Sequence, residues 1–291
     1  MTHFSYRMYV QNRLSEVMDM GEARSIMLLL FEKLFGLSVS DVLSGKADDL
    51  SEESRAVMLS CVERILKGEP VQYVLGCSDF MDMELEVNGC VLIPRPETED
   101  LVRLCLSRHS ADERLKILDI GTGSGCIALS MKKYFVNADV YGWDISADAL
   151  ELASHNAQCN GLDIYFEQHD ILNVDKVDCQ KKYDIIISNP PYVCESEKAD
   201  MESHVLNHEP STALFVPDND ALIFYNAIIG FALISLSPGG ELYFETNRRY
   251  ANEIARKMMQ KGFDDVAVAK DQFGNDRMVV GKMGLTSIYK D

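Results

Sequence analysis

The run Tyr183-Asp-Ile-Ile-Ile-Ser-Asn-Pro-Pro-Tyr192 joins a short apolar segment to a proline-rich turn. Residues 183–187 predict a buried β-strand, because they are rich in β-branched side chains, bounded by polar residues and too few for a core helix. The turn therefore follows the carboxyl end of a strand. In an open α/β sheet, ligands bind at that edge.

The residues of this turn are suited to accept hydrogen bonds. Pro190 and Pro191 fix φ and lack N–H groups, so the turn is stiff and offers carbonyl oxygens without competing donors. Asn189 adds a side-chain carbonyl and Tyr192 an aromatic face. Together they suit a planar NH2 group, held by the Asn189 side chain and the Pro190 carbonyl and covered by Tyr192. An ordinary turn is the alternative, because Asn-Pro and Pro-Pro are common turn dipeptides.

An amide or exocyclic amine is a poor nucleophile, because its lone pair is delocalised. Orienting it towards an electrophile can supply roughly 7–11 kcal/mol of a reaction barrier. We therefore predict that Asn189, Pro190 and Tyr192 are catalytic. The predicted substrate-binding residues are Asn189, Pro190, Pro191 and Tyr192.

A glycine-rich turn predicts a second part of the site. It follows the expected strand 115–120 and precedes a helix, and it reads Gly121-Thr-Gly-Ser-Gly125. Its glycines let the backbone turn tightly and approach a ligand. No lysine follows at the P-loop position, and the spacing differs from G-x-G-x-x-G, so the turn favours neither nucleoside triphosphates nor NAD or FAD.

The next two expected strands end in acidic residues. Asp144 follows strand 140–143 and can accept both hydroxyls of a ribose. Asp170 follows a strand near 164–166 and can receive an adenine amino group while Ile171 covers the ring. Adenosine without phosphates fits this pattern. The predicted cofactor-binding residues are Gly121, Thr122, Gly123, Ser124, Gly125, Asp144, Asp170 and Ile171.

The chain predicts two domains joined by a linker. Residues 1–70 have apolar residues at helical spacing and predict a helical bundle, which is either a structural cap or a substrate-docking module. Residues 71–90 predict a β-hairpin linker with its turn at Asn88-Gly89. Residues 91–284 continue the α/β alternation, with helices expected at 221–236 and 250–260 and strands at 241–246, 266–270 and 277–282.

A rigid loop precedes the first helix of the α/β domain. Two prolines flank Arg95, and either Glu97 or Thr98 is expected to open the helix. We predict that Arg95 and Glu97 support the loop. A helix N-terminus alone explains the acidic residue, but it does not explain Arg95.

Composition limits the partners. The 28 Lys and Arg against 46 Asp and Glu give a net charge of −18, which disfavours a protein that grips nucleic acid over a wide face. Eight cysteines without a Cys-x-x-Cys pair suit a reducing compartment. No signal peptide or apolar run of ~20 residues is evident, so we expect a cytoplasmic protein with no membrane partner.

Three other residue patterns have ordinary explanations. His204 and His208 stand at helix i, i+4 spacing, but no third ligand is set by spacing and no metal site is expected. Cys126 is expected to be a small packing residue. Trp143 is expected to pack between the sheet and a helix.

Several runs resemble the HemK/PrmC family of protein-glutamine methyltransferases. The main ones are Ile93-Pro-Arg-Pro-Glu-Thr-Glu99, Asp119-Ile-Gly-Thr-Gly-Ser-Gly125 and Asn189-Pro-Pro-Tyr192, supported by Gly68-Glu-Pro-Val-Gln-Tyr73, Glu209-Pro210, Pro238-Gly239-Gly240 and Gly274…Arg277. The resemblance implies a Rossmann-like class I methyltransferase α/β sheet of seven strands, the last antiparallel, with a small N-terminal helical bundle. The chain departs from the family after residues 241–245, where the family often has an acidic residue, an apolar residue and then glycine, whereas this chain has Thr246-Asn247.

The resemblance also implies an activity. S-adenosyl-L-methionine would lie over Gly121–Gly125 with Asp144 at its ribose and Asp170 and Ile171 at its adenine, and S-adenosyl-L-homocysteine would leave. Asn189 would hold the substrate amide and border the cofactor. The implied substrate is the glutamine of the Gly-Gly-Gln motif in class I peptide-chain release factors. Its methylation would tune translation termination. The N-terminal bundle would help to recognise the factor.

Two other functions stay open on the sequence alone. The same tetrapeptide serves DNA or RNA adenine and cytosine amino-methyltransferases, although the acidic charge disfavours a phosphate grip. The chain can also be a catalytically silent adenosine-binding adaptor, although the intact tetrapeptide disfavours that function.

Overall fold

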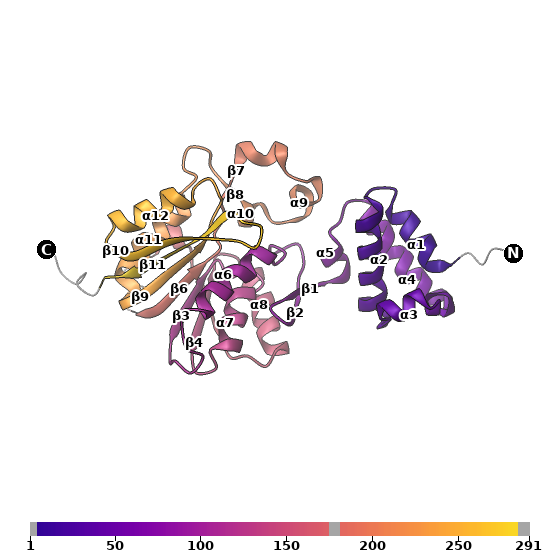
Figure 1. The fold of residues 1–291 in the computed structure, drawn as a ribbon, viewed down its shortest axis with the longest axis horizontal. Helices are drawn as coiled ribbons and strands as arrows, with labels where there is room; N and C mark the ends of the chain where they lie inside the picture. The colour runs from indigo at the N-terminus through magenta and orange to yellow at the C-terminus, as the bar shows by residue number, and fades with distance from the viewer. Residues whose placement is uncertain (1–4, 175–180, 285–291) are drawn as a thin grey trace. The chain divides into compact units, whose positions relative to one another are not determined.

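The computed structural model describes residues 5–174 and 181–284, so the first four residues of the predicted bundle lie outside it (Figure 1). The chain forms two compact units. The N-terminal unit is Met1–Cys77 with Glu202–His208, and the C-terminal unit is Ser78–Met201 with Glu209–Asp291.

The N-terminal unit is helical, as predicted. Asp19 accepts hydrogen bonds from two N–H groups of the first turn of the second helix, which ends at Gly36 with a φ of 66°. Its interior is apolar, with Val10, Leu30 and Met58 fully buried. The elements are α1 Tyr6–Leu14, α2 Met20–Phe35, α3 Val39–Leu43, η1 Lys46–Asp49, α4 Glu52–Leu66, α5 Val71–Leu75 and α9 Ser203–His208.

The segment after this bundle differs from the prediction. Residues 71–75 form helix α5, and the hairpin consists of β1 Cys77–Phe80 and β2 Met83–Glu86. Its turn is Met81-Asp82, with φ of 46° and 57°, rather than Asn88-Gly89. Two positive φ values are those of a type I′ turn, which usually takes Asn or Gly. Met81 is buried in the apolar core, and this burial offsets the backbone cost.

The C-terminal unit is built on a seven-stranded sheet ordered β10-β11-β9-β6-β3-β4-β5. Six strands run in the same direction, and β11 is antiparallel to both of its neighbours, β9 and β10. This confirms the predicted class I methyltransferase fold. The strands are β3 Lys116–Ile120, β4 Asp139–Asp144, β5 Tyr165–Gln168, β6 Tyr183–Ser188, β9 Leu236–Glu245, β10 Phe263–Lys270 and β11 Asp276–Met283.

Helices cover both faces of this sheet (Figure 1). Side chains alternate along a strand, so Ile117 packs into one apolar cluster and Leu118 into the other. The first cluster takes residues from α6 Pro96–Leu106, α7 Cys126–Tyr134 and α8 Ala147–Cys159. The second takes residues from α11 Ile223–Ser235 and α12 Ala251–Gln260.

Helix α6 begins at Pro96, before the predicted Glu97 or Thr98. Proline suits the first helical position, because the N–H it lacks would have no partner there. The remaining short elements are η2 Ile171–Asn173, β7 Val193–Cys194, η4 Glu195–Asp200, α10 Ser211–Leu214 and β8 Phe215–Val216. Within the described ranges, no helix combines the length and apolarity that a membrane crossing requires.

The order of the strands places the site. β3 lies at the centre with β4 on one side and β6 on the other, so the chain direction across the sheet reverses there. A ligand crevice is expected outside the carboxyl ends of strands at such a reversal.

Candidate active site

A cavity of about 380 Å³ lies at the carboxyl ends of β3, β4 and β6. Residues from successive βα units line it, together with the loop from Cys90 to Arg95 and residues around Pro210. It brings together these predicted site residues: Arg95, Gly121, Thr122, Gly123, Ser124, Asp144, Asp170, Ile171, Asn189, Pro190 and Pro191.

Three predicted residues lie elsewhere among the described residues. Glu97 is in the first turn of α6 and is not part of the cavity lining. Tyr192 is also outside the lining, and its hydroxyl faces Glu245. Gly125 has a φ of 83°, and a Cβ there would come within 2.6 Å of Leu129 and 3.2 Å of Ala153. Gly125 therefore allows close packing of α7 and α8.

The other two glycines leave room in the cavity. Gly121 has a φ of 75° and Gly123 a φ of 54°, and no atom lies within 4 Å of a Cβ built on either residue. Both residues line the cavity. The turn is therefore shaped for the close approach of a ligand to its backbone.

Asp119 supports the glycine-rich turn, residues 121–125, through hydrogen bonds. Its Oδ2 accepts hydrogen bonds from the Thr122 hydroxyl at 2.6 Å and the Ala128 N–H at 3.2 Å. Its side chain is buried, and burial raises the pKa of Asp119 to about 7. This role of Asp119 was not predicted from the sequence, although an acidic residue inside an apolar strand was the available signal.

Asp144 is held at the end of β4. Its two oxygens accept the N–H groups of Gly123 and Ser146, both at 2.9 Å. Each carboxylate oxygen can accept more than one hydrogen bond, so Asp144 can still receive ligand hydroxyls. Asp170 accepts the N–H of Leu172 at 2.9 Å and the side-chain amide of Asn173 at 2.6 Å.

Glu209 fixes one side of the cavity. Its carboxylate is fully buried, forms an ion pair with Arg95 at 2.5 Å and accepts the Ile93 N–H at 3.2 Å. These bonds tie the loop before α6 to the segment that enters α10. The pair Glu209-Pro210 was noted in the sequence as a family resemblance, but Arg95, the partner of Glu209, is 114 positions away.

A buried polar chain supports the proline-rich turn. The Asn189 side-chain NH2 donates to the Thr98 hydroxyl at 3.2 Å. Thr98 donates to one oxygen of Glu245 at 2.7 Å, and Tyr192 donates to the other at 3.2 Å. Burial raises the pKa of Glu245 to about 7. Sequence reasoning missed Thr98 and Glu245 as parts of this site.

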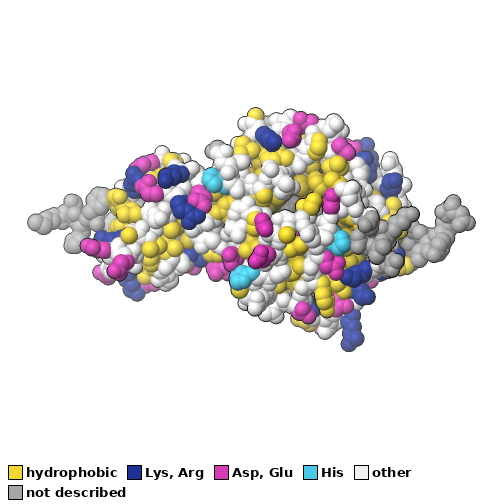
Figure 2. All heavy atoms as spheres, turned by 180° about the vertical axis from the view of Figure 1, so that it is seen from behind, with side chains coloured by type: hydrophobic (Ala, Val, Ile, Leu, Met, Phe, Trp, Pro, Cys, Tyr) yellow, Lys and Arg dark blue, Asp and Glu magenta, His cyan; other side chains and the backbone are white. Residues whose placement is uncertain are grey.

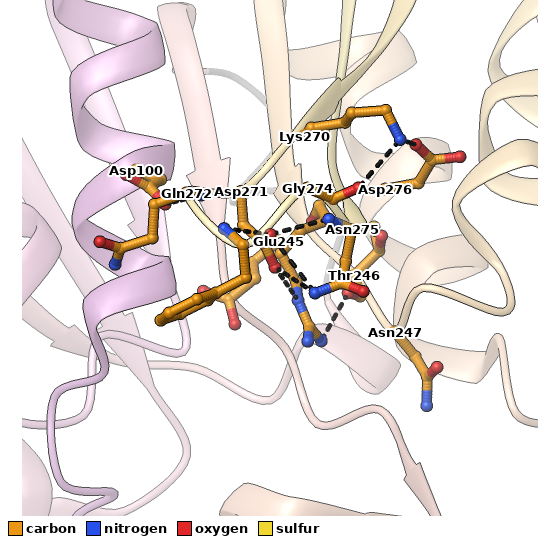
Figure 3. Close-up of polar contacts among 12 residues, drawn as sticks. Asp100, Glu245, Thr246, Asn247, Lys270, Asp271, Gln272, Gly274, Asn275 and Asp276 are labelled. Carbon is orange, nitrogen blue, oxygen red and sulfur yellow. Dashed lines mark hydrogen bonds and ion pairs between the residues drawn. The ribbon is translucent and has the colours of Figure 1, made fainter.

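The end of β9 is tied to β11. Thr246 donates its N–H to the Arg277 carbonyl at 2.8 Å, and the Arg277 guanidinium donates to the Thr246 carbonyl at 3.3 Å. Asp271 accepts from Arg277 at 3.4 Å and from the Asn275 N–H at 2.9 Å (Figure 3). Thr246, at the departure from the family pattern, therefore anchors the strand that carries Glu245.

The residues with ordinary explanations are placed as follows. Burial raises the pKa of Cys126 to about 12, so its thiol stays protonated. Trp143 packs on His169 with 4.0 Å between ring centroids. His208 faces the carbonyl oxygen of His204. Across residues 5–174 and 181–284, no three His, Cys, Asp or Glu side chains group as metal ligands.

Comparison with known proteins identifies the family. Residues 111–278 match a family model described as a methyltransferase domain, and residues 7–76 match one described as the PrmC N-terminal domain. The chain is 40% identical to the release factor glutamine methyltransferase of Bacteroides thetaiotaomicron, over 93% of this chain and 96% of the relative. The chain belongs to the release factor glutamine methyltransferase family.

A second relative supports the family, and a solved structure supports the fold. The release factor glutamine methyltransferase of Flavobacterium psychrophilum is 38% identical over 94% of this chain and 97% of the relative. A solved methyltransferase from Pyrococcus furiosus superposes with a TM-score of 0.53 at 19% identity, covering 76% of this chain and 97% of that one. The second comparison supports the fold alone. The resemblance to HemK/PrmC methyltransferases is confirmed, and the chain is a methyltransferase.

Proposed function

We propose that this methyltransferase methylates the side-chain amide nitrogen of the glutamine in the Gly-Gly-Gln motif of class I peptide-chain release factors. The observation that carries the proposal is that Asn189 and Pro190 line the same cavity as the glycine turn and Asp144. An amide-accepting turn and an adenosine-type site thus share one space. The family membership points to the same substrate.

The cavity suits S-adenosyl-L-methionine. Its volume of about 380 Å³ is within the ~300–1,000 Å³ typical of small-molecule sites. Gly121 and Gly123 would border the cofactor, Asp144 would accept its ribose hydroxyls, and Asp170 and Ile171 would meet its adenine. When bound, the cofactor supplies an electrophilic methyl group on a sulfonium, and S-adenosyl-L-homocysteine is left.

The proline-rich turn orients the acceptor. The Asn189 side-chain carbonyl and the Pro190 carbonyl would each accept one N–H of the substrate amide. The amide nitrogen would then face the methyl group, gain it and lose one proton to solvent. Orientation is the main contribution, because the turn contains acceptors and no strong base. The predicted contact of the Tyr192 ring with the amide stays a prediction.

We assign the N-terminal unit to docking of the release factor. The boundaries that we propose are residues 1–70 for this docking domain, 71–90 for the linker and 91–284 for the methyltransferase domain. The match of residues 7–76 to the PrmC N-terminal domain supports the assignment.

The charge supports a protein substrate over nucleic acid. The net charge is −18. On the face seen in Figure 2, Lys and Arg side chains are scattered among Asp and Glu. A nucleic-acid enzyme needs a connected basic surface for the phosphate backbone.

Mass-spectrometric peptide mapping tests the proposal. A purified class I release factor from the same organism is incubated with the protein and methyl-labelled S-adenosyl-L-methionine. We expect label on the Gly-Gly-Gln glutamine and none when that glutamine is replaced by glutamate. Cofactor binding without label on the factor would contradict the proposal and favour the silent adaptor or another acceptor.

A further inference from the structure

The side-chain amide of Asn189 has two unlike ends. Its oxygen only accepts hydrogen bonds and its nitrogen only donates them. The proposed function needs the oxygen to face the substrate, because the substrate amide presents N–H groups. A half-turn of the Asn189 amide would present a donor and reverse the preference of the site.

The Thr98 hydroxyl decides between these two orientations. A hydroxyl has one proton to donate. Thr98 donates that proton to Glu245 at 2.7 Å, so it can only accept from Asn189, which lies 3.2 Å away. The Asn189 nitrogen must therefore face Thr98, and its oxygen is turned away from Thr98.

Glu245 in turn fixes the direction of the Thr98 hydroxyl. Its two oxygens accept from Thr98 and Tyr192, neither of which has a second hydroxyl proton. This double acceptance is that of the ionised carboxylate, which predominates above pH 7 because burial raises the pKa of Glu245 to about 7. The positive charge of Arg277 on β11 favours the ionised form, whereas Glu97 on α6 opposes it. Glu245 is the last residue of β9, and the N–H of the next residue, Thr246, donates a hydrogen bond to the Arg277 carbonyl. Figure 3 shows Glu245 and Thr246.

We propose that Thr98 and Glu245 are positioning residues that hold the Asn189 amide with its oxygen towards the acceptor, and thereby make the site accept glutamine and reject glutamate. This inference rests on the proposed function. Glutamine offers N–H groups to the Asn189 oxygen. Glutamate offers only oxygens, which a reversed Asn189 amide would bind instead. A site built to bond an NH2 group rejects ligands that lack it.

Substitutions of Thr98 test which way the Asn189 amide is turned. Thr98→Val removes the hydroxyl with little change of shape, while Thr98→Ser keeps it. For Thr98→Val we expect kcat/KM on the release factor to fall about tenfold, the effect of one lost hydrogen bond of typical strength. Inhibition by the release factor with glutamate at the acceptor position should become about tenfold stronger. Thr98→Ser should retain both values.

Two glutamates of the same strand provide a matched pair. Glu245→Gln replaces one acceptor by a donor, so Thr98 can turn its proton towards Asn189. Glu241→Gln changes another buried glutamate, which accepts from Arg108, His109 and Tyr243 and does not line the cavity. Both variants should lower the melting temperature. Only Glu245→Gln should shift the ratio of glutamine turnover to glutamate inhibition.

The failures of the two proposals are distinguishable. If the wild-type protein methylates the factor and neither Thr98→Val nor Glu245→Gln changes the ratio, the positioning role is wrong. If the wild-type protein methylates no release factor, the proposed function is wrong. The amide orientation is then read without substrate from the Asn189 side-chain NH2 resonances, which should shift in Thr98→Val and not in Thr98→Ser. Unchanged resonances would overturn it.

Discussion

Among single residues, Asn189 is expected to make the largest direct contribution to turnover. Asn189→Ala removes one of the two acceptors proposed for the substrate amide, while Pro190 keeps the turn stiff. We expect kcat to fall on the order of 10²–10³-fold, which is the typical loss when an enzyme active site is deprived of one preorganised hydrogen-bonding group. Radiolabel transfer to the release factor measures the effect. Near-full activity with the cofactor bound would contradict the proposed mechanism, and Asn247→Ala serves as a loop control.

Two glycines of one turn should respond differently to alanine. Gly123→Ala places a methyl group in open cavity space at positive φ, so we expect weaker cofactor binding and a stability loss of about 1 kcal/mol. Gly125→Ala drives a methyl group into Leu129 and Ala153, so the main loss should be stability. Calorimetric cofactor titration and thermal unfolding separate the two effects. Equal loss of binding in both variants would refute the distinction.

At the level of strands, two buried carboxyls make stability depend on pH. Asp119 on β3 and Glu245 on β9 have pKa values raised to about 7 by burial. The nearby carboxylate of Asp144 also raises the pKa of Asp119. At Glu245, the hydrogen bonds from Thr98 and Tyr192 and the charge of Arg277 partly oppose the effect of burial on the pKa. Because the folded state binds these protons more tightly than the unfolded state, their stabilisation is complete below pH 4 and is lost as the pH rises to about 7.

Denaturation in urea at several pH values measures this loss. Carboxyls with lowered pKa values, such as Glu241, have already lost their protons at pH 5. Between pH 5 and 7, the change in the free energy of unfolding is therefore expected to come from Asp119 and Glu245. We expect Asp119→Asn and Glu245→Gln each to flatten the slope, which reaches about 1.4 kcal/mol per pH unit for each group. An unchanged slope in both variants would contradict the assignment.

Most elements could be predicted because hydrophobic periodicity is local. The Asn88-Gly89 turn was wrong because Met81 gains enough burial to hold a positive φ, which no local propensity indicates. Helix α5 was also missed. Residues 71–75 were included in the predicted β-hairpin linker 71–90, although the glycine at position 76, which has a φ of 75° in the structure, was an available signal for a helix end.

Only part of the candidate site could be predicted from the sequence. Residues that directly follow parallel strands, such as Asp144 and Asn189, could be predicted because the carboxyl ends of these strands meet at one edge. Thr98 and Glu245 could not, because their contact joins residues 147 positions apart. A polar pair of this kind leaves no spacing pattern in the chain.

For the whole molecule, the net charge of −18 sets the expected response to nucleic acid. A protein that neutralises phosphates with Lys and Arg binds DNA with an affinity that falls steeply with salt. We expect neither duplex DNA nor single-stranded RNA in excess to slow methylation of the release factor at 50 mM salt. Rates with and without competitor measure this. Inhibition that disappears as salt is raised would instead indicate a phosphate-binding surface and favour the nucleic-acid amine as acceptor.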